Sequence, residues 1–390
     1  MDFDRDIARR HTHASTWTAM PRRAGIDLDD GLPMWVADSE FATAPCVVEA
    51  MTRDVSHGAF GYGFDRDGCR EAIARWMQMR RDWTIDPGWI VWSQGLGHAI
   101  ATCIDVWSEP GEGVAYFTPV YHEFRLKTER AGRRPVPLPM ALDDGRYVLD
   151  WDAAEAAITP DTRILLFCSP QNPSGRVWRR HEIQAVAEFA ARHDLILVSD
   201  EVHADLVFPG VEFVATDLVA PDHRDRTVTL YAASKTFNLA GLRFGQMIIP
   251  DDTLRAKMAA RMDALNYDPA TLSATATIAA LSPAGADWVD AQVAYLDANR
   301  QILDAGINAI PGLWSMPLEA TFLAWIDFRG TGMEVDEIAA RIRDDARIAV
   351  SPGPDFGPGG EGWNRMNFAM PRAMVEDAVA RMQRAFGDLQ

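Results

Sequence analysis

The sequence predicts an α/β protein. We expect a large domain with a mostly parallel central sheet flanked by helices, and a smaller α+β domain beside it. Two observations carry this prediction. The chain has 390 residues, which is too long for one compact core. Its middle part alternates short apolar runs with longer helical patterns, which is typical of parallel strands connected by helices.

Six short apolar runs are the expected strands of the sheet. They are residues 90–93, 114–117, 163–168, 195–199, 227–231 and 246–249. Helical periodicity fills several intervals between them. In residues 181–192, for example, Ile183, Val186, Ala187 and Ala190 share one face.

The second half of the chain predicts the smaller domain. Residues 282–285 read Ser-Pro-Ala-Gly, a plausible break, and a long helix is expected over 287–310. A strand at 321–328 and a further helix follow. We therefore predict a large domain at 46–285 and a small domain formed by 286–390 together with an N-terminal arm, 1–45.

Composition excludes several classes of function. The formal net charge is -18, so the surface repels nucleic-acid phosphates and anionic lipids. The N-terminal residues lack an apolar stretch typical of a signal peptide, and no apolar run is long enough to span a bilayer. The four cysteines (Cys46, Cys69, Cys103 and Cys168) lack metal-ligand spacing. We expect reduced thiols, no metal site and a cytoplasmic protein.

Four expected strands end in polar or glycine-rich segments: S-Q-G-L-G-H, S-P-Q-N-P-S-G, S-D-E-V-H and A-A-S-K-T-F-N. In open α/β sheets, ligands bind in the crevice at the carboxyl ends of the strands. The sequence therefore predicts one site into which these four segments point.

Lys235 is the candidate nucleophile of this site. The chain contains only three lysines, and Lys235 follows the apolar run T-V-T-L-Y-A-A with one serine between them. Desolvation at a strand end lowers the pKa of an amine and makes it nucleophilic. The alternative is a surface lysine. Lys127 and Lys257 lie among charges on expected helices, so we interpret both as surface residues.

Other residues at these strand ends have two interpretations each. Asp200 is either a helix N-cap or the partner of a buried cation, such as a protonated pyridine nitrogen. Asn172 marks a turn or donates an amide hydrogen to a ring oxygen. Tyr121 packs in the core or stacks on a ring. His203 either has a purely structural role or forms a hydrogen bond near that ring.

Three features predict anion binding. Gly95, Leu96 and Gly97 open a helical stretch, whose free N–H groups and dipole attract phosphate. Arg243, eight residues after Lys235, adds positive charge or is a surface residue. Arg365 could clamp a carboxylate bidentately, with Arg372 as the competing candidate in the same segment.

The segment S-K-T-F-N-L-A-G-L-R-F-G closely resembles the Schiff-base segment of fold-type I pyridoxal-phosphate (PLP) enzymes, the class I/II aminotransferase superfamily. The N-P-x-G turn, the S-D-E segment, the lysine and the arginine follow one another in the order typical of that family. The resemblance covers essentially the whole chain. Segments such as M-W-V-A-D-S-E-F, G-Y-G-F and F-T-P-V-Y-H-E-F resemble the cystathionine β-lyase-like C–S lyases of the MalY/PatB type.

This resemblance implies roles for the candidate residues. Lys235 forms the Schiff base with PLP and moves the substrate proton, aided by the other catalytic residues, Asp200 and Tyr121. The implied cofactor-binding residues are Gly95, Leu96, Gly97, Tyr121, Asn172, Asp200, His203, Ser234, Lys235 and Arg243. The implied substrate-binding residues are Trp35, Ala37, Asn172 and Arg365. Tyr62 matches a tyrosine that reaches the neighbouring subunit's phosphate, which implies a homodimer with shared sites.

The chain also departs from the family pattern. Histidine stands at 203, where many aminotransferases have tyrosine, and Ala232 replaces a serine that binds phosphate. The segment Ala37-Asp38-Ser39-Glu40-Phe41 departs from the usual A-D-M-D-F at Ser39 and Glu40, which leaves substrate identity open. We expect acidic Asp38 and Glu40 at the pocket entrance, where they would discourage dicarboxylic substrates.

The implied function is β-elimination from cystathionine or an S-substituted cysteine, which gives pyruvate, ammonia and a thiol. Transamination of an amino acid is the alternative, since the same residues serve both reactions. A non-catalytic regulatory binding protein is a remote third hypothesis, which the complete set of cofactor residues argues against.

Overall fold

The computed structural model describes residues 1–389. Its main sheet has seven strands, which in spatial order are β2 (Ile90–Ser93), β10 (Gly245–Ile248), β9 (Thr227–Tyr231), β8 (Ile196–Asp200), β7 (Thr162–Cys168), β3 (Gly113–Thr118) and β4 (Arg134–Pro139). Only β10 is antiparallel to its neighbours; the other pairs are parallel. The carboxyl ends of six strands therefore share one edge.

The six predicted strands match this sheet to within one residue at each end. The edge strand β4 was not predicted. Its sequence is R-P-V-P-L-P, and alternating prolines lack the N–H groups that a ladder needs. β4 pairs with β3 alone, so those missing donors are tolerated at the sheet edge.

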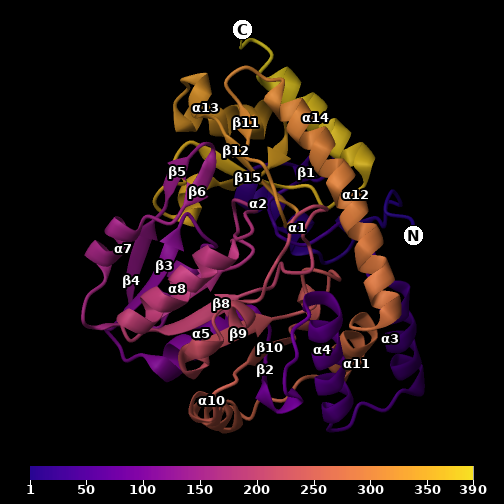
Figure 1. Ribbon diagram of the computed structural model, residues 1–390. Coiled ribbons are helices and arrows are strands. Elements are labelled where there is room, and N and C mark those ends of the chain that lie inside the picture. The colour runs from indigo at the N-terminus through magenta and orange to yellow at the C-terminus, as the bar shows by residue number, and fades with distance from the viewer. Residues whose placement is uncertain (390) are drawn as a thin grey trace.

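Helices cover both faces of this sheet (Figure 1). They include α5 (Leu96–Trp107), α6 (Glu123–Arg130), α7 (Trp151–Ala157), α8 (Arg180–Arg192) and α10 (Asp252–Ala264). The apolar face predicted for α8 is buried, with Ile183 and Val186 fully inaccessible. Burial of such side chains contributes about 1.5–3 kcal/mol each, which holds the helix on the sheet.

A second, antiparallel sheet lies in the C-terminal part of the chain. Its strands are β11 (Trp314–Ser315), β12 (Leu323–Asp327), β15 (Trp363–Asn367) and β14 (Ser351–Pro352). The accompanying helices are α12 (Pro283–Asn308), α13 (Val335–Ala340) and α14 (Arg372–Ala385), and Figure 1 shows α12 and α14 side by side. α12 begins at the predicted break, where the Ser282 side chain accepts a hydrogen bond from the Gly285 N–H group.

The N-terminal arm joins this C-terminal part. It contains α1 (Ser15–Thr18), α2 (Met20–Ala24) and β1 (Leu32–Pro33), and β1 pairs in parallel with β13 (Ile348–Ala349). Two further helices, α3 (Pro45–His57) and α4 (Arg66–Arg81), follow the arm and pack against α11 (Thr271–Ala280). The pairing of β1 with β13 is what supports grouping 1–45 with 286–390; the domain boundaries stay a prediction.

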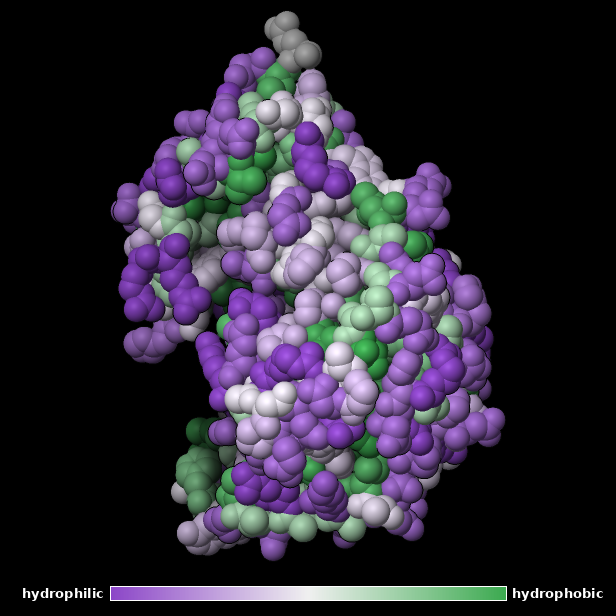
Figure 2. All heavy atoms as spheres, turned by 90° about the vertical axis from the view of Figure 1, so that its left-hand side faces the viewer, coloured by the Kyte–Doolittle hydropathy of each residue, from purple (hydrophilic) through white to green (hydrophobic). Residues whose placement is uncertain are grey.

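The drawn face of the surface is mainly hydrophilic (Figure 2). Hydrophobic side chains form small separate groups on it. Within residues 1–389, no helix combines the length and the apolar character needed to cross a membrane.

Candidate active site

A cavity of about 510 Å³ lies at the carboxyl edge of the main sheet. We call it the sheet-edge cavity. Its lining includes the predicted residues Ala37, Gly95, Leu96, Gly97, Tyr121, Asn172, Asp200, His203, Ser234, Lys235 and Arg243. The four polar strand ends thus meet in one place, as predicted, because β2, β7, β8 and β9 all end at that edge.

One end of the sheet-edge cavity is built for an anion. α5 begins at Leu96, and Gly95 caps it with a φ of +76°, which L side chains rarely adopt. A side chain at Gly95 would also come within 3.9 Å of the Arg243 Cα atom. The free N–H groups and dipole of the first turn therefore lie beside Arg243 and Ser234, an arrangement that attracts phosphate.

Lys127 also lines this cavity, so its interpretation as a surface residue is wrong. A Cβ atom on Gly97 would lie 3.7 Å from the Lys127 Cε atom, which places the lysine beside the first turn of α5. Its Nζ atom is 2.9 Å from Glu123, one turn earlier on α6. The local sequence is highly charged, and only the packing of α6 against α5 reveals that this lysine turns inward.

Lys235 lies four residues beyond the end of β9 and lines the cavity. Its Nζ atom donates a hydrogen bond to the Ala37 carbonyl oxygen at 2.6 Å. Burial lowers the pKa of Lys235 to about 8; the positive charge of Arg365 also lowers it, while Asp38 and Asp200 raise it. An amine with this pKa is partly neutral at physiological pH, and a neutral amine can act as a base or nucleophile.

Asp200 is the last residue of β8, and His203 lies three residues beyond it. No helix begins there, which excludes the N-cap interpretation of Asp200. Its carboxylate accepts a hydrogen bond from the Val202 N–H group at 3.2 Å, and burial raises its pKa to about 6. Burial, followed by the charges of Lys235 and Arg365, holds the pKa of His203 well below its ordinary value. Its Nδ1 atom is buried without a hydrogen-bond partner among residues 1–389.

Tyr121 and Asn172 come from neighbouring strand ends and are tied together. The Tyr121 N–H group donates to the Asn172 carbonyl oxygen at 3.0 Å. The Gln171 side chain donates to the Pro119 carbonyl oxygen at 2.6 Å. These two bonds hold the loops after β3 and β7 together, so the Tyr121 ring and the Asn172 amide face the same cavity.

A second cavity of about 840 Å³ adjoins the first, and Ala37, Tyr121 and Lys235 line both. We call it the arm chamber, because the N-terminal arm forms one wall. Sequence reasoning did not predict it as a whole. Its other lining residues include Arg23, Trp35, His122, Val335, Ile338, Ile342, Arg343, Ile348, Ser351, Asp355, Phe356, Trp363, Asn364 and Arg365.

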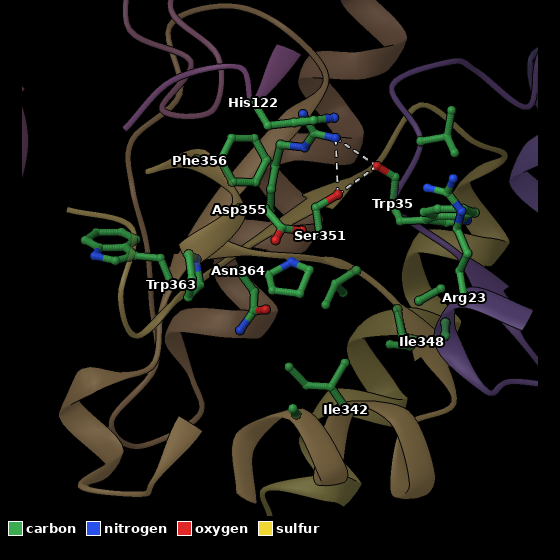
Figure 3. A pocket seen from close by; sticks show the side chains of 18 of the residues that line it. Arg23, Trp35, His122, Ile342, Ile348, Ser351, Asp355, Phe356, Trp363 and Asn364 are labelled. Carbon is green, nitrogen blue, oxygen red and sulfur yellow. Dashed lines mark hydrogen bonds between the residues drawn. The ribbon is translucent and has the colours of Figure 1, made fainter. Parts of the chain in front are cut away.

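Arg365 lies on β15 and lines the arm chamber, of which Figure 3 labels the neighbouring residues Trp35, Ser351 and Phe356. Its guanidinium donates to Asn172 Oδ1 at 3.0 Å, to the Trp35 carbonyl oxygen at 2.8 Å and to Ser351 Oγ at 3.3 Å. Burial lowers its pKa to about 10, and it forms no salt bridge with a carboxylate in residues 1–389. Arg372 instead begins α14, stacks on Tyr295 and lines neither cavity.

Asp38 and Glu40 do not form an acidic entrance, so that expectation is wrong. Both carboxylates pair with Arg9 at 2.6 Å, and neither residue lines the sheet-edge cavity or the arm chamber. Glu40 also accepts a hydrogen bond from Trp17. Sequence reasoning missed Arg9. Its ion pairs with Asp38 and Glu40 anchor the segment that contains Ala37, whose carbonyl oxygen accepts the hydrogen bond from Lys235.

Tyr62 is the one predicted cofactor residue that this chain does not bring to its own sheet-edge cavity. It lies fully exposed in the loop between α3 and α4. Trp35, predicted to bind substrate, lines the arm chamber, and its indole N–H donates to the Thr16 carbonyl oxygen at 2.9 Å.

Comparison with known proteins agrees with this architecture. The family model "Aminotransferase class I and II" matches residues 32–382. Cystathionine beta-lyase PatB of Bacillus subtilis is 32% identical over 99% of this chain and 100% of its own length. Protein MalY of Escherichia coli is 33% identical over 97% of each chain. The crystal structure of PLP-containing cystalysin from Treponema denticola superposes with a TM-score of 0.94 at 30% identity, covering 100% of this chain and 99% of that one.

The matched region includes both cavities and nearly the whole fold, as the sequence resemblance implied. This chain is a member of the class I and II aminotransferase family.

Proposed function

We propose that this protein is a PLP-dependent C–S β-lyase that acts on cystathionine or another S-substituted cysteine. One observation carries the proposal. Lys235, an amine whose pKa burial lowers to about 8, lies where an anion-binding cavity meets a chamber containing the unpaired Arg365. A cofactor on one side and an amino-acid carboxylate on the other would both come within reach of that amine.

The sheet-edge cavity fits PLP in three respects. The α5 N-terminus, Ser234 and Arg243 suit its phosphate. The buried carboxyl of Asp200 suits the protonated pyridine nitrogen, because an ion pair would offset the burial that raises its pKa. The unpartnered Nδ1 atom of His203 and the Asn172 amide lie beside the same space.

When bound, PLP supplies an electron sink for the charge left by removal of the substrate's α-proton. Arg365 binds the α-carboxylate and orients the amino acid, and the neutral amine of Lys235 takes the α-proton. Departure of a thiolate from the β-carbon completes the elimination. With PLP in this cavity, Asp200 would keep the pyridine nitrogen protonated, and Tyr121 would supply an aromatic surface for the ring.

Elimination is favoured over transamination because relatives that match over nearly their full length are named for it. PatB is named a cystathionine β-lyase. The chemistry agrees, since thiolate loss is intramolecular and needs no second substrate. Aminotransferase activity is the alternative, on the strength of the family itself.

The active protein is, in this proposal, a cytoplasmic homodimer. Several large apolar side chains are exposed on α3 and on the loop after it, including Val48, Val55, Phe60 and Tyr62. Contact with a second copy would cover them and bring Tyr62 to the partner's phosphate end.

Incubation with cystathionine or S-methylcysteine in the absence of any keto acid tests the proposal. We expect pyruvate, ammonia and thiol in equal amounts over many turnovers. Turnover that requires a keto acid and releases no thiol would identify an aminotransferase instead.

A further inference from the structure

The arm chamber is far larger than cysteine chemistry alone requires. Its volume of about 840 Å³ adjoins the 510 Å³ at the sheet edge and comes in addition to it. A chamber of this size accommodates a ligand much larger than cysteine with a methyl group on its sulfur. The excess space lies on the substrate side, next to Arg365.

The chamber wall is mainly apolar away from Arg365. Figure 3 shows the side chains of Ile342, Ile348, Phe356 and Trp35 around this space. Val335 and Ile338 of α13 extend the same surface. Apolar and aromatic walls favour a large hydrophobic substituent, because its burial removes apolar area from water.

The charges at the chamber are mostly positive, although the chain carries a net charge of -18. Arg23, Arg343 and Arg365 line it, whereas Asp355 is its one acidic lining residue in the described chain. Arg343 pairs with Asp344, and Arg365 is assigned to the α-carboxylate. Arg23 has no salt bridge and no side-chain hydrogen bond within residues 1–389, and its guanidinium lies 5.7 Å from the centre of the Trp35 ring. Arg23 is also solvent-exposed, so water screens its charge and the guanidinium is free to pair with an anion on a ligand in the chamber.

We propose that the arm chamber receives the sulfur substituent of the substrate, and that this substituent is a bulky apolar group with an anion at its far end, facing Arg23. The inference rests on the proposed lyase function and names its substrate class. With one water, the overall reaction converts such a cysteine conjugate to pyruvate, ammonia and the bulky thiol. The Cβ–S bond breaks, and the sulfur leaves with the bonding pair and takes up a proton.

Three substrates test the two parts of this inference: S-methylcysteine, S-benzylcysteine and S-(4-carboxybenzyl)cysteine. We expect kcat/KM for thiol release to rise in that order. The step from methyl to benzyl should exceed about 30-fold, since even a single methylene in an apolar pocket changes rates about 10- to 200-fold. The carboxylate should add about fivefold, as expected for a partly exposed ion pair.

Two variants assign these effects to the chamber. Val335 is half-exposed on the chamber wall, so Val335→Trp should fit without disturbing the core and should lower kcat/KM for both benzyl substrates only. Arg23→Gln should lower kcat/KM about fivefold for the carboxybenzyl substrate only. The matched controls are Leu142→Trp and Arg22→Gln, exposed residues that do not line the chamber, and they should change nothing.

The outcomes separate this inference from the function on which it rests. Thiol release from all three substrates with equal kcat/KM, or an equal loss for all three in Arg23→Gln, overturns the chamber assignment and leaves the lyase function standing. Release of no thiol from any of them overturns the lyase function and the inference together.

Discussion

The two cavities that meet at Lys235 are built in different ways. The sheet-edge cavity gathers residues from strand ends at one edge of a single sheet. The arm chamber is mainly apolar away from Arg365 and combines segments about 300 residues apart, around Arg23–Ala37 and Val335–Arg365. The first holds groups suited to a cofactor and its electronics; the second holds groups suited to a substrate. The comparison suggests that the chemistry is set at the sheet edge and the specificity in the chamber.

Lys235→Ala should have the largest effect, because this residue serves both cavities. We expect thiol release to fall by at least about 10³-fold, since the amine that moves the α-proton is lost. A coupled pyruvate assay measures this. Lys257→Ala is the control, because Lys257 lies on α10 and lines neither cavity. Substantial activity in Lys235→Ala would contradict the role of Lys235 as the amine that serves both cavities.

Arg365→Ala should damage the chamber and spare the sheet edge. Loss of a buried charged hydrogen-bond partner costs about 2–5 kcal/mol of binding, so KM should rise at least about 30-fold. PLP affinity, measured by its visible absorbance, should stay close to that of the unmodified protein. If Arg372→Ala shows this pattern and Arg365→Ala does not, the carboxylate site has been placed wrongly.

Hybrid dimers test whether the sheet-edge cavity is completed by a second copy. Lys235→Ala and Tyr62→Phe chains should each form impaired homodimers. In a hybrid with shared sites, one site carries both changes and the other carries neither, so activity should return on mixing. Isolated heterodimers that stay as impaired as the parent proteins would contradict a contribution of Tyr62 across the interface.

Asp200→Asn should have the smallest of these effects, and the quantity that changes is the free energy of unfolding. Burial raises the pKa of Asp200 to about 6, so the folded state binds this proton more tightly than the unfolded state. The carboxyl therefore destabilises the cofactor-free fold increasingly as pH rises through 6, and the neutral amide removes that penalty. Urea unfolding should show a gain of about 1–3 kcal/mol at pH 8 that shrinks toward pH 4.

Asp222→Asn, at an exposed position, is the matched control and should show no such pH dependence. PLP binding by Asp200→Asn should weaken under the same conditions, because the partner of the pyridine nitrogen is lost. Equal stability of Asp200→Asn and the unmodified protein at pH 4 and pH 8 would contradict the buried, raised-pKa carboxyl.

The two cavities also differ in how far the sequence could predict them. Asp200, Asn172 and Lys235 each follow an apolar strand within a few residues, so the local pattern brings them to one sheet edge. Lys127 was missed because it lies in a highly charged helix and only the packing of α6 reveals its direction. Arg9 was missed because it acts through carboxylates about 30 residues away.

The arm chamber was largely unpredictable because segments far apart in the sequence form it. Trp35 and Arg365 were identified by resemblance, but the chamber exists only because β1 pairs with β13, which brings the arm against α13 and β14. A two-residue strand such as Leu32–Pro33 has no periodicity to detect. Strand β4 was not predicted because its alternating prolines are atypical of a strand.

The most direct test of the account is to map the lysine that carries the cofactor. Borohydride reduction of the PLP-loaded protein, followed by proteolysis and mass spectrometry, fixes pyridoxal phosphate to the amine that holds it. Lys127 makes the test stringent, because it lines the same cavity as Lys235. We predict the label on the peptide that contains Lys235 alone. A label on Lys127 or Lys257 would contradict the assignment on which both cavities' roles depend.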